Sequence, residues 1–512
     1  MSSRIKKISM LLVAAVLLVI SGQIQHSMNG DRERLGLTKV DPLENAPPML
    51  AFTTVALGGF RGLISNALWM RANSLQDEDK FFEMVQLSDW ITKLEPHFSQ
   101  VWIFEAWNMA YNISVKFKDF PDRWRWVQRG VELLRDEGLR YNPDDVAIHQ
   151  QLAWFFEHKI GANLDDANQY YKAQWAQEMT PLFGADGTNL AALIAPQTAL
   201  DRTNVAVLRG KYKFDPAFAQ RVNSEYGPFD WRVPESQAIY WAAEGLERAK
   251  ENPTRVNAED LMTLRRTIYQ SMAQSFHHGR LSINPFTQGL EFGPNLDLIP
   301  KVNAAWETQM REDPAEQFKM VTGHRNFLAD AVYFLYVNDR ITDAAKWYRI
   351  LSDRYPDKSI LENDTNSLPR NLTLDEYAFA RVQSELGDTS QERTTAVIQG
   401  LLRRSYVELA LSENDRYAGF RRIAQKAYEN FSSKTAGHGG EARVGLPPFN
   451  EMDRQAVDFV LDNRHEVLPY AARAAIRTQL GMLAETNAPP PSVISTNLPV
   501  SVETNSAAPA AE

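Results

Sequence analysis

The sequence predicts an all-α protein. In the stretch WVQRGVELLRDEGL, apolar residues recur three or four positions apart, at Val127, Val131 and Leu134, which places them on one side of a helix. Few stretches alternate between apolar and polar residues, as half-buried strands do. Glycine and proline fall mainly between the periodic stretches, where helices are expected to end.

The composition is that of an ordinary globular protein, and it excludes several classes of function. A chain of 512 residues predicts about three domains. Its net charge of −9 argues against a nucleic-acid-binding protein, which requires a basic surface. The absence of cysteine excludes disulfides, thiolate metal sites and a cysteine nucleophile.

The N-terminus carries a signal for insertion into the cytoplasmic membrane. An apolar run from Ile8 to Ile20 follows three basic residues, Arg4, Lys6 and Lys7. The basic end of such a segment stays in the cytoplasm. The run is shorter than a spanning helix of about 17 to 25 residues, which favours a cleaved signal peptide. Extension to Ile24 reaches the lower limit of a span and favours an uncleaved anchor. We therefore assign residues 1–24 to a membrane anchor or signal segment, and both alternatives place the rest of the chain outside the cytoplasmic membrane.

The stretch ITDAAKWYRILSDRYPD, residues 341–357, has a small, an aromatic and an aliphatic residue and a proline at intervals of four, three and five. These residues are Ala344, Tyr348, Leu351 and Pro356. The series resembles the second helix of a tetratricopeptide (TPR) repeat, in which the small residue lets two helices approach and the proline ends the helix. Counting back along the chain gives small or apolar residues at the matching positions of the first helix, namely Leu328, Ala331 and Leu335.

Two further stretches resemble the junction between successive TPR units. Pro96 is followed six residues later by Trp102, and Pro143 is followed six residues later by His149, where the family usually has tryptophan. Glu105 stands where the family usually has leucine. The resemblance implies a TPR-like α-solenoid, in which stacked helix pairs form a right-handed superhelix.

The resemblance implies a solenoid in two blocks. The first block covers residues 49–180 and the second covers residues 234–430. Residues 181–233 are rich in glycine, proline and aspartate and are predicted to be an irregular insertion. The other segments are predicted as a linker (25–48), a flexible loop (431–450), closing helices (451–485) and a disordered tail (486–512).

Aromatic residues in the first helices indicate a groove for a protein or peptide partner. In TPR arrays the first helices line a concave groove, and Trp107, Trp154 and Tyr333 hold the same position in three repeats. Aromatic side chains with amide and charged neighbours suit an extended peptide or an amphipathic helix. The alternative is that these side chains only fill the core between helices. The resemblance implies a partner groove lined by Gln100, Ile103, Trp107, Tyr111, Gln150, Trp154, Glu157, His158, Asn326, Tyr333 and Tyr336.

No residue pattern indicates catalysis, a cofactor or a metal site. The sequence contains no phosphate-binding glycine loop, no nucleophile elbow and no dinucleotide fingerprint. His277 and His278 are adjacent, so on a helix they point about 100° apart and cannot readily share a metal. Asp165 and Asp166 precede a repeat helix and are expected to cap it.

These observations predict a non-catalytic scaffold or adaptor that is tethered by its N-terminal helix and binds a protein partner on the outer face of the cytoplasmic membrane. One alternative is an enzyme acting on envelope polymers, with its site in residues 181–233. Another is a subunit of a membrane complex that docks through residues 49–70, where Arg61 is the single charge. That stretch forms the first buried helix of the array, an interfacial helix or a second span. The sequence leaves the partner and the oligomeric state open.

Overall fold

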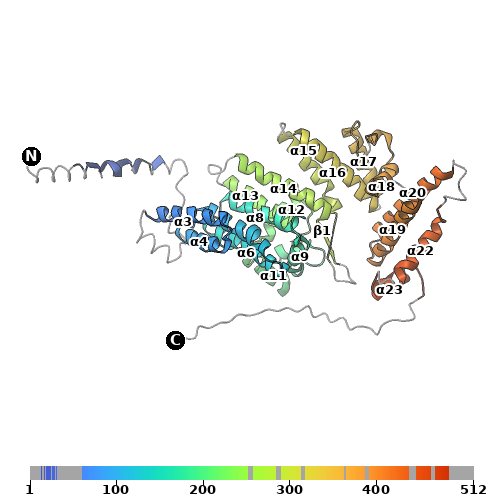
Figure 1. Ribbon diagram of the computed structural model, residues 1–512, viewed down its shortest axis with the longest axis horizontal. Coiled ribbons are helices and arrows are strands. Elements are labelled where there is room, and N and C mark those ends of the chain that lie inside the picture. Colours follow the sequence, from blue (N-terminus) through green and yellow to red (C-terminus); the bar gives the residue numbers. More distant parts are fainter. Residues whose placement is uncertain are drawn as a thin grey trace, which may run out of the picture. The chain divides into compact units, whose positions relative to one another are not determined.

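The computed structural model describes residues 60–188, 190–251, 258–283, 290–312, 317–338, 340–361, 365–386, 391–436, 446–462 and 468–483 (Figure 1). Between Val13 and Asp31 it describes scattered positions, which are helical. The predicted tail (486–512), most of the predicted linker (25–48) and the middle of the predicted loop (431–450) lie outside the described residues. No helix in the described part of the chain has the length and apolar character needed to cross a membrane. The N-terminal anchor therefore stays a prediction.

The prediction of an all-α protein is confirmed. Helices dominate the described residues, and a hairpin of two short strands is the only sheet among them. In this hairpin β1 (Arg280–Ile283) pairs antiparallel with β2 (Leu290–Gly293), and Leu281 lies opposite Phe292. Leu281 also packs with Val233, which ties the hairpin to the helical core.

The chain divides into two compact units, each described separately below. The first unit ends at Ala331 and the second begins at Val332, so the division falls inside α16 (Gln317–Val337). The sequence instead predicts two blocks separated by residues 181–233. That segment belongs to the first unit.

The first unit consists mainly of helices joined by short loops. Three of these helices change to a wider π-helical turn, a feature that is frequent at functional sites. Apart from the hairpin, the start of α16 and the helices of residues 190–226 described below, the elements in chain order are α3 (Phe60–Asp77), α4 (Phe81–Leu94), α5 (Ser99–Trp107) with η1 (Asn108–Ile113) and η2 (Ser114–Lys116), α6 (Phe120–Glu132) with η3 (Leu133–Gly138) and α7 (Leu139–Tyr141), α8 (Val146–Trp154) with η4 (Phe155–Gly161), α9 (Asn168–Phe183), α13 (Pro234–Glu251), α14 (Ala258–His278), η6 (Leu296–Leu298) and α15 (Ile299–Glu312). The π-helical turns are η1, η3 and η4.

Neighbouring helices of the first unit pack largely in chain order (Figure 1). Helix α3 packs against α4, α5 against α6 and α13 against α14, while α8 contacts both α5 and α13. In the loop before α5, the Pro96 carbonyl accepts hydrogen bonds from the Trp102 indole nitrogen and the Asn142 amide nitrogen, both at 2.8 Å. The Trp102 ring also stacks on Tyr141. The hydrogen bond from Asn142 to Pro96 therefore joins the loop before α8 to the loop before α5.

Two glycines allow close approach between these helices. Gly130 of α6 lies against α5, where an added Cβ atom would be 2.7 Å from the carbonyl oxygen of Ala106. Gly245 of α13 lies against α8, where an added Cβ atom would be 3.0 Å from the Cβ atom of His149. A larger side chain at either position would force the helices apart.

The prediction that residues 181–233 are irregular is wrong over residues 190–226. This stretch forms α10 (Leu190–Ile194), α11 (Ala199–Gly210) and α12 (Pro216–Tyr226). The polar residues and prolines that suggest loops in the sequence begin these helices instead. The side chain of Thr198 and that of Asp201 form a capping box at α11. At α12, the Asp215 carboxylate caps the helix and Pro216 occupies its first turn.

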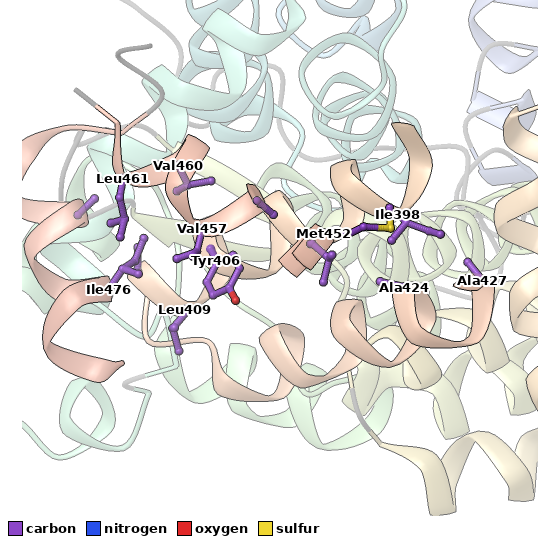
Figure 2. Close-up of a cluster of buried hydrophobic side chains, with 14 residues drawn as sticks. Ile398, Tyr406, Leu409, Ala424, Ala427, Met452, Val457, Val460, Leu461 and Ile476 are labelled. Carbon is purple, nitrogen blue, oxygen red and sulfur yellow. The ribbon is translucent and has the colours of Figure 1, made fainter. Parts of the chain in front are cut away.

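The second unit has a hydrophobic core of its own. Figure 2 shows this core, where buried side chains of α19, α20, α22 and α23 meet. Ile398 and Tyr406 come from α19, Met452 and Val460 from α22, and Ile476 from α23. After the end of α16, the elements of this unit are α17 (Ile341–Arg354), η7 (Pro369–Asn371), α18 (Leu374–Leu386), α19 (Gln391–Ala410), α20 (Asn414–Ala436), α22 (Phe449–Leu461) and α23 (Tyr470–Gln479).

The repeat-like stretch at residues 341–357 contains α17. Ala344 and Leu351 are buried on one side of this helix. The Tyr348 hydroxyl lies 2.9 Å from the carbonyl oxygen of Pro369 and 2.7 Å from that of Leu372. The aromatic residue of the series therefore anchors the segment that leads into α18.

Candidate functional site

Four aromatic side chains from two neighbouring helices meet in the first unit, and we call them the aromatic cluster. Trp107 is the last residue of α5, and Tyr111 lies in the π-helical turn η1 that follows. Trp154 is the last residue of α8, and His158 lies in η4. Because α5 contacts α8 and η1 contacts η4, the two pairs of side chains lie side by side.

The rings of the aromatic cluster form a continuous strip. Trp107 stacks on Tyr111 with ring centres 5.4 Å apart, and Trp154 stacks on His158 with ring centres 4.4 Å apart. The Tyr111 hydroxyl oxygen joins the two stacks because it lies 3.0 Å from Nδ1 of His158. The Trp154 side chain is 37% exposed, and the other three are half-buried. A partner could therefore contact the strip without the protein first opening.

The surroundings of the aromatic cluster favour the uncharged forms of Tyr111 and His158. Burial raises the pKa of Tyr111, as does the nearby Glu157, while a hydrogen bond with Trp154 lowers it. Burial lowers the pKa of His158, and the positive charge of Lys159 lowers it further. In the tautomer with its proton on Nε2, His158 accepts at Nδ1 a hydrogen bond that the Tyr111 hydroxyl donates. An uncharged strip of stacked rings suits an apolar or aromatic anchor on a partner.

Glu157 does not line an open groove as predicted. Glu157 is only 4% exposed, and its Oε2 atom is buried without a hydrogen bond. Burial raises the pKa of Glu157 to about 7. The groove assignment of Glu157 comes from its position in the TPR repeat, which is built from α-helices, whereas the i→i+5 hydrogen bonds of η4 widen the helix and change the direction of its side chains.

A buried charge network lies next to the aromatic cluster. The Lys159 Nζ atom lies 5.1 Å from the centre of the Tyr111 ring and 2.6 Å from a carboxylate oxygen of Asp165. Arg123 contacts the same carboxylate at 3.1 Å. Burial lowers the pKa of Lys159, and the hydrogen bond from Lys159 to Asp165 opposes this effect.

The charge network was not predicted from the sequence. The expected capping role of Asp165 and Asp166 is wrong, because Ala167 is the N-cap of α9 and no side chain caps this helix; Asp165 accepts its hydrogen bond from the backbone nitrogen of Ala167 itself. Its partners Lys159 and Arg123 come from η4 and α6. No local spacing could have identified them, because long-range packing brings these charges together.

The remaining predicted groove residues have varied surroundings. On the helices that carry the aromatic cluster, Gln100 is exposed, while Ile103 and Gln150 are half-buried. On α16, Asn326 is exposed and Tyr333 is half-buried. Tyr336 is wrongly predicted as a groove residue, because it is 1% exposed and its hydroxyl lies 2.5 Å from an Asp375 carboxylate oxygen within the second unit.

A second cluster of buried titratable groups lies where α9, α13 and α14 meet. Glu235, in the first turn of α13, has a buried Oε2 atom without a hydrogen bond. Its Oε1 atom lies 3.7 Å from Nε2 of His278. Burial raises the pKa of Glu235 to about 7 and lowers that of His278 to about 4. Burial also lowers the pKa of Lys172, whose Nζ atom lies 2.5 Å from Oδ1 of Asn163.

The two adjacent histidines have different partners. Nε2 of His277 lies 3.8 Å from Asp330, whereas Nε2 of His278 faces Glu235. Across the described ranges, no group of three histidine, aspartate or glutamate side chains could hold a metal ion.

A pocket of about 210 Å³ lies between α14 and α15. Its walls include Met262, Arg265, Tyr269, Gln309 and Glu312. Arg265 and Glu312 form an ion pair across it at 3.2 Å. Arg266 also lines the pocket, so its charged wall residues are two arginines and one glutamate.

Comparisons with protein families, with curated proteins and with solved structures find no match.

Proposed function

We propose that the protein is a membrane-tethered, non-catalytic TPR-like scaffold that binds a protein or peptide partner outside the cytoplasmic membrane. The partner would contact the aromatic cluster on α5 and α8. The observation that carries this proposal is the joining of Trp107 and Tyr111 to Trp154 and His158 across two helices.

The packing of the first unit supports a TPR-like arrangement. In such arrays, the first helices of successive pairs lie next to one another and line a concave surface. Here α8 contacts both α5 and α13, and α6 and α14 follow α5 and α13 as their second helices. The aromatic cluster would then lie on the surface formed by first helices, where large rings act as anchors for an extended peptide or an amphipathic helix.

The membrane tether rests on the N-terminal sequence. Three basic residues precede the apolar run from Ile8 to Ile20, and this order favours insertion with the basic end in the cytoplasm. The bulk of the chain would then lie on the outer side of the membrane.

The carboxylates described in residues 181–233 favour the scaffold over an enzyme of envelope polymers. Asp201 and Asp215 cap helices. Asp230 forms an ion pair with Arg232 at 2.7 Å and accepts a hydrogen bond from the backbone nitrogen of Leu281 at 3.0 Å. Asp186 accepts a hydrogen bond from the backbone nitrogen of Thr188, so four of the five carboxylates in this segment have structural partners. The fifth, Glu225, is a single carboxyl group, whereas a glycosidase needs two carboxyl groups facing its substrate.

Site-specific photo-crosslinking in native membranes tests the proposed groove. A photoreactive amino acid replaces Gln150 on α8 in the full-length chain, and the matched control replaces Gln177, an exposed amide on α9. We expect a discrete protein adduct from position 150 and none from position 177. Combining Trp107→Ala with Trp154→Ala should lower the yield at position 150 about tenfold, because anchoring rings dominate such interfaces.

Circular dichroism of the double variant provides the folding control. If the helical signal is retained and the adduct yield is unchanged, the aromatic cluster is not the binding surface. Equal adducts from positions 150 and 177 would also contradict a specific groove.

A further inference from the structure

Helix α3 exposes an apolar stripe on the side opposite its buried face. Leu63 and Met70 are 71% and 67% exposed, and Ala67 between them is also exposed. Their spacing of four and three residues places all three on one face of the helix. Ala72 and Leu75 lie on the other side, in a core shared with α4.

The stripe is unusual for the first described helix of a stacked array. Terminal helices of such arrays normally present a polar outer face, because no further repeat covers them. Here residues 62–70, GLISNALWM, contain no charge. Helix α4, which packs on α3, adds two exposed aromatic side chains, Phe82 at 57% and Trp90 at 51%. Exposed apolar surface of this kind marks a contact with a partner or a membrane.

We propose that the exposed face of α3 rests on the lipid surface of the membrane, at the level of the headgroups. An interfacial helix buries leucine, methionine and aromatic side chains about 5–10 Å into the boundary between headgroups and acyl chains. Since Leu63, Ala67 and Met70 are apolar and the stretch around them is uncharged, this contact removes no charge from water.

The position of α3 in the chain favours lipid over other occupants. The inference rests on the membrane tether of the proposed function. Residues 32–59, between Asp31 and the start of α3, can span at most about 100 Å even when fully extended. The tether therefore keeps α3 near the bilayer, where a weak surface contact is strengthened by high effective concentration. A second copy of the chain would have to meet α3 by diffusion, because the tether does not hold it beside this helix.

Depth-dependent fluorescence quenching tests the contact in the full-length protein. The chain has no cysteine, so Leu63→Cys introduces a single labelling site for an environment-sensitive fluorophore. The matched control is Leu200→Cys on α11, where the leucine is 66% exposed. Each labelled protein is reconstituted in phosphatidylcholine–phosphatidylglycerol vesicles that contain lipids with a quencher on the acyl chain.

We expect quenching at position 63 to exceed quenching at position 200 by about threefold or more, as expected for a side chain below the headgroups. Met70→Cys should behave like Leu63→Cys. Equal quenching at positions 63 and 200 overturns the inference. A blue-shifted fluorophore at position 63 that lipid does not quench also overturns it, because protein, either a second copy or residues 49–59, then covers the stripe.

Vesicle flotation separates this inference from the proposed tether. If the protein floats with the vesicles but position 63 is not quenched, the contact of α3 fails and the tether stands. If the protein does not float, the tether fails and the contact of α3 fails with it. Circular dichroism of each variant checks that the exposed substitutions leave the helices intact.

Discussion

The Tyr111 hydroxyl lies 3.0 Å from Nδ1 of His158, although 47 residues separate the two side chains in the sequence. This hydrogen bond connects the π-helical turn after α5 to the one after α8. It also fixes the distance between the two stacked ring pairs that would anchor a partner. The contact therefore couples the stability of the first unit to the shape of its candidate binding surface.

Replacing Tyr111 with phenylalanine should lower the free energy of unfolding by about 1 kcal/mol, because a half-buried neutral hydrogen bond is lost. Urea denaturation followed by circular dichroism measures the change. The control is Tyr141→Phe, since the Tyr141 ring stacks on Trp102 and its hydroxyl makes no hydrogen bond within the described residues. Equal losses in the two variants would mean that the hydrogen bond of the Tyr111 hydroxyl does not contribute to the free energy of unfolding.

Glu105→Leu should stabilise the protein more at pH 8 than at pH 5. Burial raises the pKa of Glu105 from 4.5 to about 8. Because the folded protein holds this proton more tightly than the unfolded chain, the protonated carboxyl group contributes its full stability below pH 4.5. This contribution is lost as the pH rises towards 8. Leucine removes this loss, so the gain at pH 8 should exceed the gain at pH 5 by about 3 kcal/mol. Urea denaturation at both pH values measures it, and equal gains would show that the carboxyl group does not titrate as a buried acid.

Asp165→Asn should lower the free energy of unfolding by about 3 kcal/mol, because it leaves the buried Lys159 and Arg123 without their shared carboxylate. Asp166→Asn is the matched control. Asp166 also contacts Arg123, at 2.6 Å, but its side chain is 72% exposed, and the loss there should be below about 1 kcal/mol. Thermal and urea unfolding of both variants compare the two carboxylates directly. Similar losses would show that the buried ion pairs of Asp165 stabilise the protein no more than the exposed ion pair of Asp166.

Gly245→Ala should destabilise the protein by about 1–3 kcal/mol, because the new methyl group would meet the Cβ atom of His149 at 3.0 Å where α13 crosses α8. Gly400→Ala on α19 is the control, since nothing lies within 4 Å of its added Cβ atom. That substitution should stabilise its helix by up to about 1 kcal/mol through helix propensity. Denaturant midpoints of the two variants should therefore move in opposite directions. A shift in the same direction would contradict the close packing of α13 on α8.

The sequence predicts the helices well where local periodicity decides the structure. The spacing of Pro96 and Trp102 indicates a junction, and the structure contains a hydrogen bond between these residues. Local signals mislead the prediction for residues 190–226, because proline and aspartate indicate loops there, whereas Asp201 and Asp215 stand at the starts of helices. Caps and loops use the same residue types, and only the following apolar pattern separates them.

The candidate site could be predicted only in part. Trp107, Tyr111, Trp154 and His158 do come together, since they sit at equivalent positions of neighbouring helices. The burial of Glu157 could not be predicted, because its groove assignment uses a repeat position defined for α-helices, whereas η4 is π-helical. The same holds for the contacts of Lys159 with Asp165 and Tyr111, which depend on how whole helices pack.

The wide turn at Phe155–Gly161 has a consequence for insertions and deletions in the gene. Removing one residue within this turn would restore i→i+4 bonding in the last residues of the helix, which ends at Gly161, and would change the direction of the side chains after the deletion. The backbone would stay helical, yet His158 and Lys159 would leave Tyr111. A one-residue deletion in this turn should therefore give a folded chain with an altered aromatic cluster. A deletion inside α8 itself would instead displace the buried side chains of α8 from the core.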